Sequence, residues 1–189
     1  MSASILDTTP KSGDYPEKHF GQTFNSRLWI KFTDNNQEEW AGCFSKQYPT
    51  ADKVATSSNN ETAFILAGGR GYLIDIQTRE LLHLIDDLPT IESLVHTTGP
   101  EYFILGACWT IYIFDTRKFI KQIDPDCTVD GIYFTDQRDK KAIGHLYAPA
   151  YSQNSNVSFE FDLENEKWTI DPNKKVTLPG QFEPTPENK

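Results

Sequence analysis

Histidines, cysteines and carboxylates are the residues of this sequence that could carry out chemistry, and their spacing limits what that chemistry could be. The four histidines, at positions 19, 83, 96 and 145, are scattered, and none lies at metal-ligand spacing from a cysteine or another histidine. His83 and His96 fall on neighbouring expected strands, yet two histidines supply fewer than the three or four protein ligands of a zinc site. The sequence therefore indicates no metal site and no cofactor.

Nucleophilic catalysis is not indicated either. The three cysteines are widely spaced without a Cys-x-x-Cys pattern, and no Gly-x-Ser-x-Gly motif is present. The stretch LAGGRG (66–71) lacks the Gly-Lys-Ser/Thr ending of a phosphate-binding loop, so we expect its glycines to form a tight turn with positive φ. No carboxylate lies in an apolar segment that would raise its pKa for acid–base catalysis. We predict no catalytic residue, and a protein that is not an enzyme.

The charge of the chain indicates the kind of partner. Its 27 acidic and 18 basic residues give a formal net charge of −9. Nucleic acids and anionic membranes select clustered Lys and Arg, so the sequence argues against both as partners. A basic protein surface is the natural complement. The unpaired cysteine pattern, and an N-terminus without the basic and apolar stretches of a secretory signal, indicate a cytoplasmic protein.

Acidic residues gather at the expected strand edges and turns, where charges far apart in sequence can pool into one field. A loop at 147–156 interrupts the repeat described below, and such insertions tend to fall on a binding face. Exposed tyrosines there could anchor an interface. The predicted partner-binding residues are Asp86, Asp87, Asp124, Asp126, Asp130, Tyr147, Tyr151, Glu160, Glu164 and Glu166.

The elements that must position these residues are short strands. Between the two ends of the chain, β-branched and aromatic segments alternate with turn signals roughly every 8–12 residues, as expected of an all-β domain. AFIL (63–66) and YFIL (102–105) each begin a unit that later reaches Thr-Arg, at 78–79 and at 116–117. A period near 40 residues with four short strands is typical of a β-propeller blade, and predicts repeats near 52–90, 91–127 and 128–170.

Two details of these repeats predict local structure. The runs AFIL, YFIL and IYIF are continuously apolar, so both faces of those strands should be buried, as in stacked sheets. Phe114-Asp115 and Phe161-Asp162 stand where WD40-type propeller repeats carry Trp-Asp, and the stretch 52–170 resembles that family. The resemblance lacks the Gly-His pair that opens such blades. It implies that Asp75, Asp115 and Asp162 form turn hydrogen bonds at strand ends.

The fold predicted is all-β, a small or partial β-propeller of four-stranded blade-like repeats, with a β-sandwich as the alternative. The hairpin at 27–45 would complete a fourth blade with a C-terminal strand such as KVTL (175–178). We expect a loosely ordered N-terminal arm over 1–22, a single domain over 23–178, and a disordered tail over 179–189.

The function predicted from these features is binding rather than catalysis. A small acidic β-rich domain without a catalytic constellation is similar in type to bacterial immunity proteins. The resemblance implies inhibition of a nuclease toxin by carboxylates that mimic phosphate in its basic cleft. The alternative is a non-catalytic scaffold or adaptor subunit, whose open sheet edges a partner strand completes.

Overall fold

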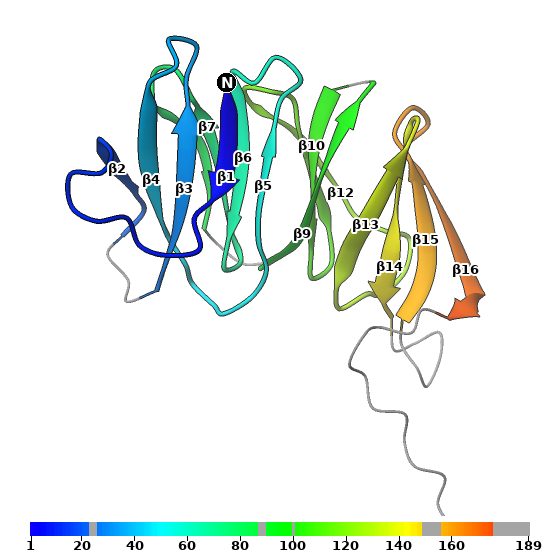
Figure 1. Cartoon of the computed structure of the whole chain (residues 1–189). Coiled ribbons are helices and arrows are strands. Elements are labelled where there is room, and N and C mark those ends of the chain that lie inside the picture. Colours follow the sequence, from blue (N-terminus) through cyan, green and yellow to red (C-terminus); the bar gives the residue numbers. More distant parts are fainter. Residues whose placement is uncertain (23–25, 87–89, 100, 149–155, 176–189) are drawn as a thin grey trace, which may run out of the picture.

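The part of the chain that a computed structural model describes forms sixteen strands in four four-stranded sheets (Figure 1). The structure describes residues 1–22, 26–86, 90–99, 101–148 and 156–175. Within these ranges there is no helix, and hence none long and apolar enough to cross a membrane. The all-β prediction of four-stranded, blade-like units is confirmed. The sheets number four instead of the two of a simple sandwich, and we name them blades 1 to 4.

Blades 2, 3 and 4 are built from consecutive antiparallel strands and correspond to the three expected repeats. Blade 2 contains β5 (Asp52–Thr56), β6 (Thr62–Ala67), β7 (Arg70–Asp75) and β8 (Leu81–Ile85). Blade 3 contains β9 (Ile91–Thr98), β10 (Glu101–Ala107), β11 (Ile111–Phe114) and β12 (Phe119–Ile123). Blade 4 contains β13 (Ile132–Arg138), β14 (Lys141–Tyr147), β15 (Asn156–Asp162) and β16 (Lys167–Lys175).

Blade 1 is assembled differently from the prediction. Its strands, in sheet order, are β1 (Ser2–Ile5), β3 (Arg27–Thr33), β4 (Glu39–Ser45) and β2 (Glu17–Phe20). The hairpin at 27–45 is confirmed, but both added strands come from the N-terminus, and β2 runs parallel to β4. The expected loose arm over 1–22 is therefore wrong. Residues 176–178, which include most of the expected completing strand, lie outside the described residues, as does the predicted tail.

The N-terminal segment is held because it covers an apolar face. Leu6 and Tyr15 pack against Trp29, Ala41 and Cys43 on the outer side of blade 1. This segment therefore covers the outer apolar face of blade 1, at one end of the row of blades. Apolar contacts of this kind secure a segment whose own strands are only four residues long.

Side chains of alternating direction fill the space between neighbouring blades. On β6, Ala63, Ile65 and Ala67 join the core shared with blade 1, whereas Phe64 and Leu66 join the core shared with blade 3. All five are fully buried. A strand sandwiched on both sides needs apolar residues at every position, which explains the continuous apolar runs. A third core joins blades 3 and 4.

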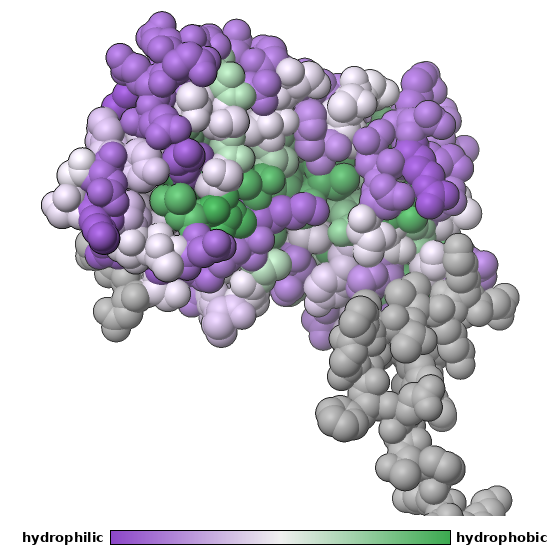
Figure 2. Space-filling model, viewed as in Figure 1, coloured by the Kyte–Doolittle hydropathy of each residue, from purple (hydrophilic) through white to green (hydrophobic). Residues whose placement is uncertain are grey.

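The row of blades does not close into a ring. Blades 1 and 4 lie at opposite ends of the row (Figure 1), and among the described residues no core cluster joins them. The first strand of each blade lies on the same side of the row, where β1 neighbours β5, β5 neighbours β9, and β9 neighbours β13. Figure 2 shows hydrophobic surface across the middle of one face, bordered by hydrophilic residues at both ends.

The expected turn hydrogen bonds at the strand ends are confirmed. The Asp75 carboxylate accepts the Thr78 backbone N–H at 2.9 Å, and Asp115 accepts from the two residues that follow Thr116. Asp162 accepts the backbone N–H groups of the second and third residues after it. The LAGGRG turn has positive φ at Gly68 (52°) and Gly69 (87°), as its glycines predict.

The repeated Thr-Arg sequence has a physical role that connects one blade to the previous one. Arg79, in the β7–β8 turn, lies 5.7 Å from the Trp40 ring and 3.5 Å from the Glu38 carboxylate, both on blade 1. Arg117, in the β11–β12 turn, reaches the buried Asp75 carboxylate of blade 2 at 3.0 Å. The two arginines thus occupy equivalent positions, each reaching back to the preceding blade.

Candidate functional site

The turns at one end of the blades collect carboxylates. Consecutive antiparallel strands place the β8–β9, β10–β11 and β12–β13 connections at the same end, the lower one in Figure 1. Backbone hydrogen bonds hold two of these connections to neighbouring segments, from Ile91 N–H to the Gly69 carbonyl in the β6–β7 turn and from Asp130 N–H to the Tyr147 carbonyl at the end of β14. We call this surface the acidic rim and define it by Asp86, Glu92, Asp124, Asp126 and Asp130.

Basic residues are sparse along the sequence segments that form the acidic rim. No Lys or Arg occurs in residues 80–116, nor in 122–137. The ion pairs seen in the described part of the chain use none of the five rim carboxylates. Asp86, Asp124, Asp126 and Asp130 are exposed, and Glu92 is half-buried. The rim therefore presents carboxylates that no ion pair among the described residues neutralises.

Neighbouring ionisable groups respond to this field. Burial raises the pKa of the Glu92 carboxyl, and the negative charge of Asp130 raises it further. Burial likewise raises the pKa of the Cys108 thiol, with Glu92 and Asp130 adding to the effect. The pKa of Tyr133 is raised to about 12 by burial first and then by Glu92. Part of each upward shift comes from neighbouring carboxylates, which indicates a negative local potential, and such a potential attracts a cation.

An aromatic side chain stands out from the same end of the molecule. Trp109, in the β10–β11 turn, is 49% exposed, the most of any large apolar side chain among the described residues. Trp is the residue type most enriched in binding hot spots, particularly where surrounding contacts exclude water. Tyr147 is half-buried beside Asp130. An exposed aromatic side chain at the same end of the blades as exposed carboxylates suits a basic protein surface better than a small molecule.

The structure divides the residues predicted from sequence into two groups. One group falls at the end of the blades that carries the acidic rim: Asp86 after β8, Asp124, Asp126 and Asp130 between β12 and β13, and Tyr147 at the end of β14. Asp87 and Tyr151 lie outside the described residues.

The carboxylates at 160–166 do not belong to the rim. Glu160 pairs with Lys141 at 2.7 Å, and Glu164 pairs with Lys140 at 2.9 Å. Glu166 pairs with Lys121 of blade 3. Glu164 and Glu166 lie in the β15–β16 turn, at the opposite end of blade 4. This group is largely neutralised by the chain's own lysines, so a basic partner gains less from it.

Sequence reasoning missed Glu92, and it considered Trp109 as an interface anchor without including it among the predicted site residues. Glu92 is the second residue of an apolar strand, and its neighbours gave no sign of a charge cluster. The signal that favours both residues is the long stretch of residues 80–116 without Lys or Arg. A tryptophan in a turn of such a stretch has acidic but no basic residues near it in the sequence.

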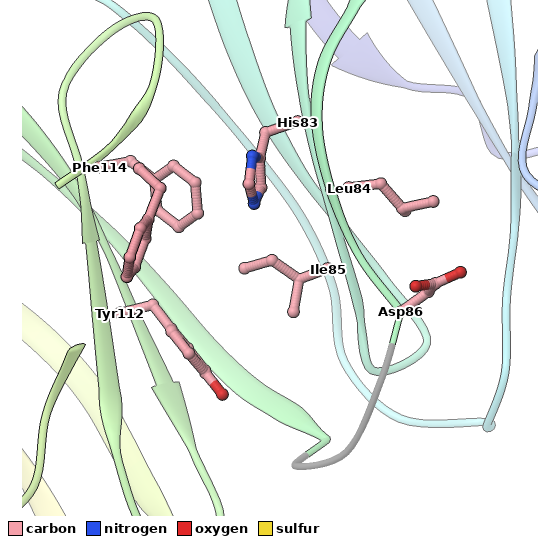
Figure 3. Close-up of a pocket in the computed structure, with 7 residues that line it drawn as sticks. His83, Leu84, Ile85, Asp86, Tyr112 and Phe114 are labelled. Atoms are coloured by element: carbon pink, nitrogen blue, oxygen red, sulfur yellow. The ribbon is translucent and has the colours of Figure 1, made fainter. Parts of the chain in front are cut away.

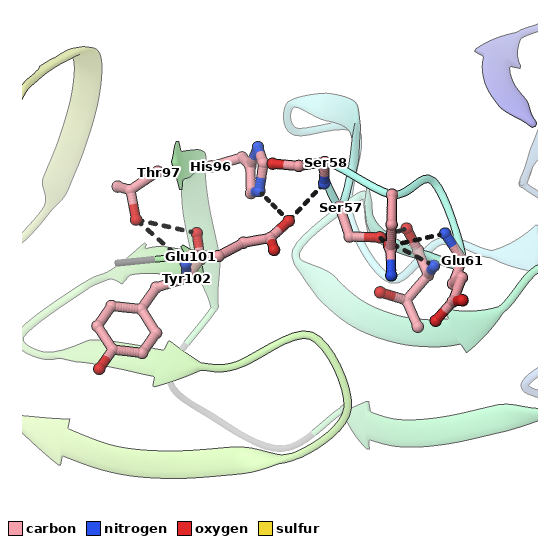
Figure 4. A network of polar contacts seen from close by, with 9 residues as sticks. Ser57, Ser58, Glu61, His96, Thr97, Glu101 and Tyr102 are labelled. Carbon is pink, nitrogen blue, oxygen red and sulfur yellow. Dashed lines mark hydrogen bonds and ion pairs between the residues drawn. The ribbon is translucent and has the colours of Figure 1, made fainter. Parts of the chain in front are cut away.

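A His–Glu–Ser cluster at the opposite end has a structural role (Figure 4). Glu101 accepts the Ser58 backbone N–H and lies 3.3 Å from His96 Nε2. Burial alone would raise the pKa of Glu101, but hydrogen bonds from Ser58 and His96 outweigh it and lower that pKa. The hydrogen bond between Ser58 and Glu101 joins blade 2 to blade 3, and both partners bind the carboxylate. A nucleophile–base pair would instead place a hydroxyl on the imidazole.

Among the residues that the structure describes, no group of three or more His, Cys, Asp or Glu is placed to hold a metal ion. The three cysteines are free.

His145 on the outer face of blade 4 is a buried titratable group with a testable consequence. It stacks on Tyr133 with ring centroids 5.0 Å apart, and its Nδ1 has no hydrogen-bond partner within the described residues. Burial lowers its pKa below the usual value. Since the unfolded chain then takes up the proton first, stability should be complete above pH ~6.5 and should be lost as pH falls below it.

We therefore expect the free energy of unfolding to decrease between pH 7.5 and 5.5, with His145 contributing at most about 1.4 kcal/mol per pH unit. His145→Phe keeps a ring against Tyr133 and removes the titration, so its decrease should be smaller. Urea denaturation at several pH values measures both proteins. Parallel pH curves for the two would contradict the assignment to His145.

Comparison with known proteins yields similarity of structure only. No family model matches the sequence, and no curated protein matches it. Hydrazine synthase of Kuenenia stuttgartiensis is similar at 16% identity and a TM-score of 0.45, covering 67% of this chain and 36% of that chain. Hsv2 of Kluyvelomyces marxianus is similar at 12% identity and a TM-score of 0.42, covering 83% of this chain and 61% of that chain.

A eukaryotic initiation factor is similar at 13% identity and a TM-score of 0.45, covering 90% of this chain and 43% of that chain. The chain spans between about a third and three fifths of these structures, at 36% to 61% of their length. At such identities and TM-scores, the argument for a function comes from the acidic rim itself.

Proposed function

We propose that this protein is a non-catalytic binding module that docks a basic protein partner on its acidic rim. The observation that carries the proposal is the group of carboxylates Asp86, Glu92, Asp124, Asp126 and Asp130, which form no ion pair within the described chain. Unpaired carboxylates on one surface attract a positive partner over a distance of about a Debye length, near 10 Å at 0.1 M salt.

The partner class that we propose is a nuclease toxin, with this chain as its cytoplasmic immunity protein. A nuclease binds phosphates through clustered Lys and Arg, so its cleft is a basic surface that carboxylates can fill. Asp124, Asp126 and Asp130 fall within seven residues of one connection, which allows several contacts in a single cleft. Trp109 would supply the apolar anchor that electrostatic steering alone lacks.

The test is affinity capture from the native lysate with the tagged chain as bait, followed by washes at about 50 and then about 500 mM salt. The higher salt shortens the distance over which charges attract one another. We expect a single basic protein that weakens at high salt, together with nuclease activity that added chain inhibits. The matched bait carries Asp124→Asn, Asp126→Asn and Asp130→Asn. Equal capture by the two baits would contradict docking at the rim, and a captured partner without nuclease activity would contradict the immunity assignment.

A second candidate function is a scaffold or adaptor subunit. The open row of blades favours it, since outermost strands such as β8 and β12 pair with only one neighbour within their sheets. A partner held mainly by such edges would be retained at high salt, because backbone hydrogen bonds and apolar contacts are weakly screened. The same two washes therefore separate the two functions.

A further inference from the structure

A cavity opens between the outer parts of blades 2 and 3 (Figure 3). Its volume is about 190 Å³, and the residues that line it come from β8 and its C-terminal end and from β11 and β12. Small-molecule sites are commonly about 300–1,000 Å³, so this cavity suits one large side chain better than a free ligand. We call it the blade 2–3 groove, and its lining residues are His83, Leu84, Ile85, Asp86, Tyr112, Phe114 and Phe119.

Aromatic rings form most of its wall. His83 lies 5.1 Å from the Phe114 ring, and it stacks on Phe119 with centroids 6.3 Å apart and planes 18° from parallel. Phe114 and Phe119 meet edge to face at 5.3 Å. In Figure 3 the side chains of His83 and Ile85 point from β8 towards the rings of blade 3. The wall is thus preformed by ring packing, and an apolar side chain would enter without reordering it.

The strands beside the groove are unusually apolar at their exposed positions. Leu81 on β8 is 39% exposed, while Phe119 and Ile120 on β12 are 41% and 40% exposed. Exposed apolar side chains gathered on adjacent elements mark an interaction surface rather than ordinary scatter. Both strands are also the outermost of their sheets, so an extended chain could lie beside either edge.

The charge near the groove indicates the chemistry of the side chains that it would bind. Asp86 follows β8 at the mouth of the groove, but in Figure 3 its carboxylate lies on the Leu84 side of β8, turned away from the rings. Asp124 directly follows β12 and is close enough to Tyr112 to raise the pKa of its hydroxyl, after the larger effect of burial. Asp124 belongs to the acidic rim, so the groove opens onto the rim. An aromatic wall with a carboxylate at one end complements a side chain with an apolar stem next to a positive charge.

We propose that the blade 2–3 groove binds an extended segment of a partner protein in which a leucine or phenylalanine side chain lies beside a lysine or arginine. The apolar side chain packs against Phe114, Phe119 and His83, and the cation meets Asp124. This inference rests on the proposed function, to which it adds the recognition of a short linear segment by an apolar pocket.

The test uses two pools of fluorescein-labelled octapeptides, so it needs no knowledge of the partner. Each peptide in the first pool carries one leucine or phenylalanine and two lysines among serines and alanines, and the second pool has glutamates in place of the lysines. Fluorescence anisotropy with the full chain at about 50 mM salt measures binding, where exposed charges are weakly screened. The NMR chemical shifts of the His83 ring protons show whether the peptide binds in the groove. We expect the lysine pool to bind and to shift the His83 signals, and the glutamate pool to do neither.

Three variants assign that binding to the groove. Phe119→Ala, at an exposed position, should weaken it at least about tenfold, as expected for an aromatic hot spot. Asp124→Asn should reduce the preference for the lysine pool. Ile5→Ala, at a similarly exposed apolar residue on β1 of blade 1, is the matched control and should change the affinity less than about twofold, as for a residue outside the contact.

The outcomes separate this inference from the function on which it rests. Unshifted His83 signals, or equal binding to Phe119→Ala and to the unaltered chain, would overturn the groove as a binding site. Equal affinity for the two pools would overturn the requirement for a cation. If the chain captures a basic protein in a salt-sensitive way but does not bind the lysine pool, the proposed function stands and only this inference is refuted. If the chain binds the lysine pool but captures no basic protein, this inference stands and the proposed function is refuted.

Discussion

Replacing Asp124, Asp126 and Asp130 with asparagine should slow association with the basic partner at least about tenfold at low salt, because charge steering commonly raises association rates by about 10- to 1,000-fold. The three carboxylates are exposed and form no ion pair in the described chain, so their removal should not lower stability. Stopped-flow or surface-plasmon kinetics with the captured partner at about 50 and 500 mM salt measures the effect, which should shrink at the higher salt.

The matched control changes the same number of charges elsewhere. Glu160→Gln, Glu164→Gln and Glu166→Gln together remove three carboxylates that pair with lysines of the chain itself. We expect association to slow less than about twofold, since neutralised pairs project little field. If both triple variants slowed association equally, net charge rather than the rim would be responsible. If neither did, binding by charge would be wrong.

Most of the blade architecture was predictable from residue patterns. Continuous apolar runs such as AFIL indicate strands buried on both faces, and β6 sends Ile65 to one neighbour and Phe64 to the other. Turn aspartates and the Gly68-Gly69 pair predict their own local geometry, because short side-chain hydrogen bonds and positive φ are decided within a few residues. The same locality makes the Thr-Arg repeat visible before its role is known.

Blade 1 could not be predicted in the same way. SASI and EKHF are four-residue strands without strong alternation, and nothing local distinguishes them from a loop. What orders them is tertiary. β1 pairs with β3, β2 pairs with β4, and the segment between them covers Trp29. Pairing across more than twenty residues depends on which apolar face needs cover, and sequence periodicity carries no information on that.

The sequence predicted that the site is acidic better than it predicted which acidic residues form it. The turns of a blade alternate between its two ends. Once the number of strands is known, Asp86 and the carboxylates of residues 124–130 are therefore expected at the same end. The carboxylates of 160–166 looked equivalent in sequence, yet Lys121 approaches Glu166 from another blade, 45 residues away along the chain. Whether an acidic cluster is free or neutralised is a property of the folded neighbourhood, so only the structure separates the two clusters.

The close approach of blades 3 and 4 depends on one glycine, and Gly106→Ala should destabilise the protein by about 3 kcal/mol, near the upper end of ordinary overpacking. A Cβ at this position on β10 would lie 2.1 Å from the Ile132 carbonyl oxygen and 2.5 Å from Ser93 Oγ. The Ser93 hydroxyl donates to that carbonyl at 2.9 Å and accepts the Phe134 N–H at 3.0 Å. The methyl group therefore meets backbone that cannot rotate away, and it disrupts a buried bridge between β9 and β13.

Gly99→Ala is the matched control, because a Cβ there meets nothing within 4 Å. It should change the free energy of unfolding by less than about 0.5 kcal/mol, as surface substitutions usually do. Urea denaturation of both variants and the unaltered chain gives the comparison. A Gly106→Ala protein as stable as the Gly99→Ala protein would mean that blades 3 and 4 are not packed at this distance. A selective loss would show that the row of blades is held by backbone approach as well as by its apolar cores, since no side chain is removed.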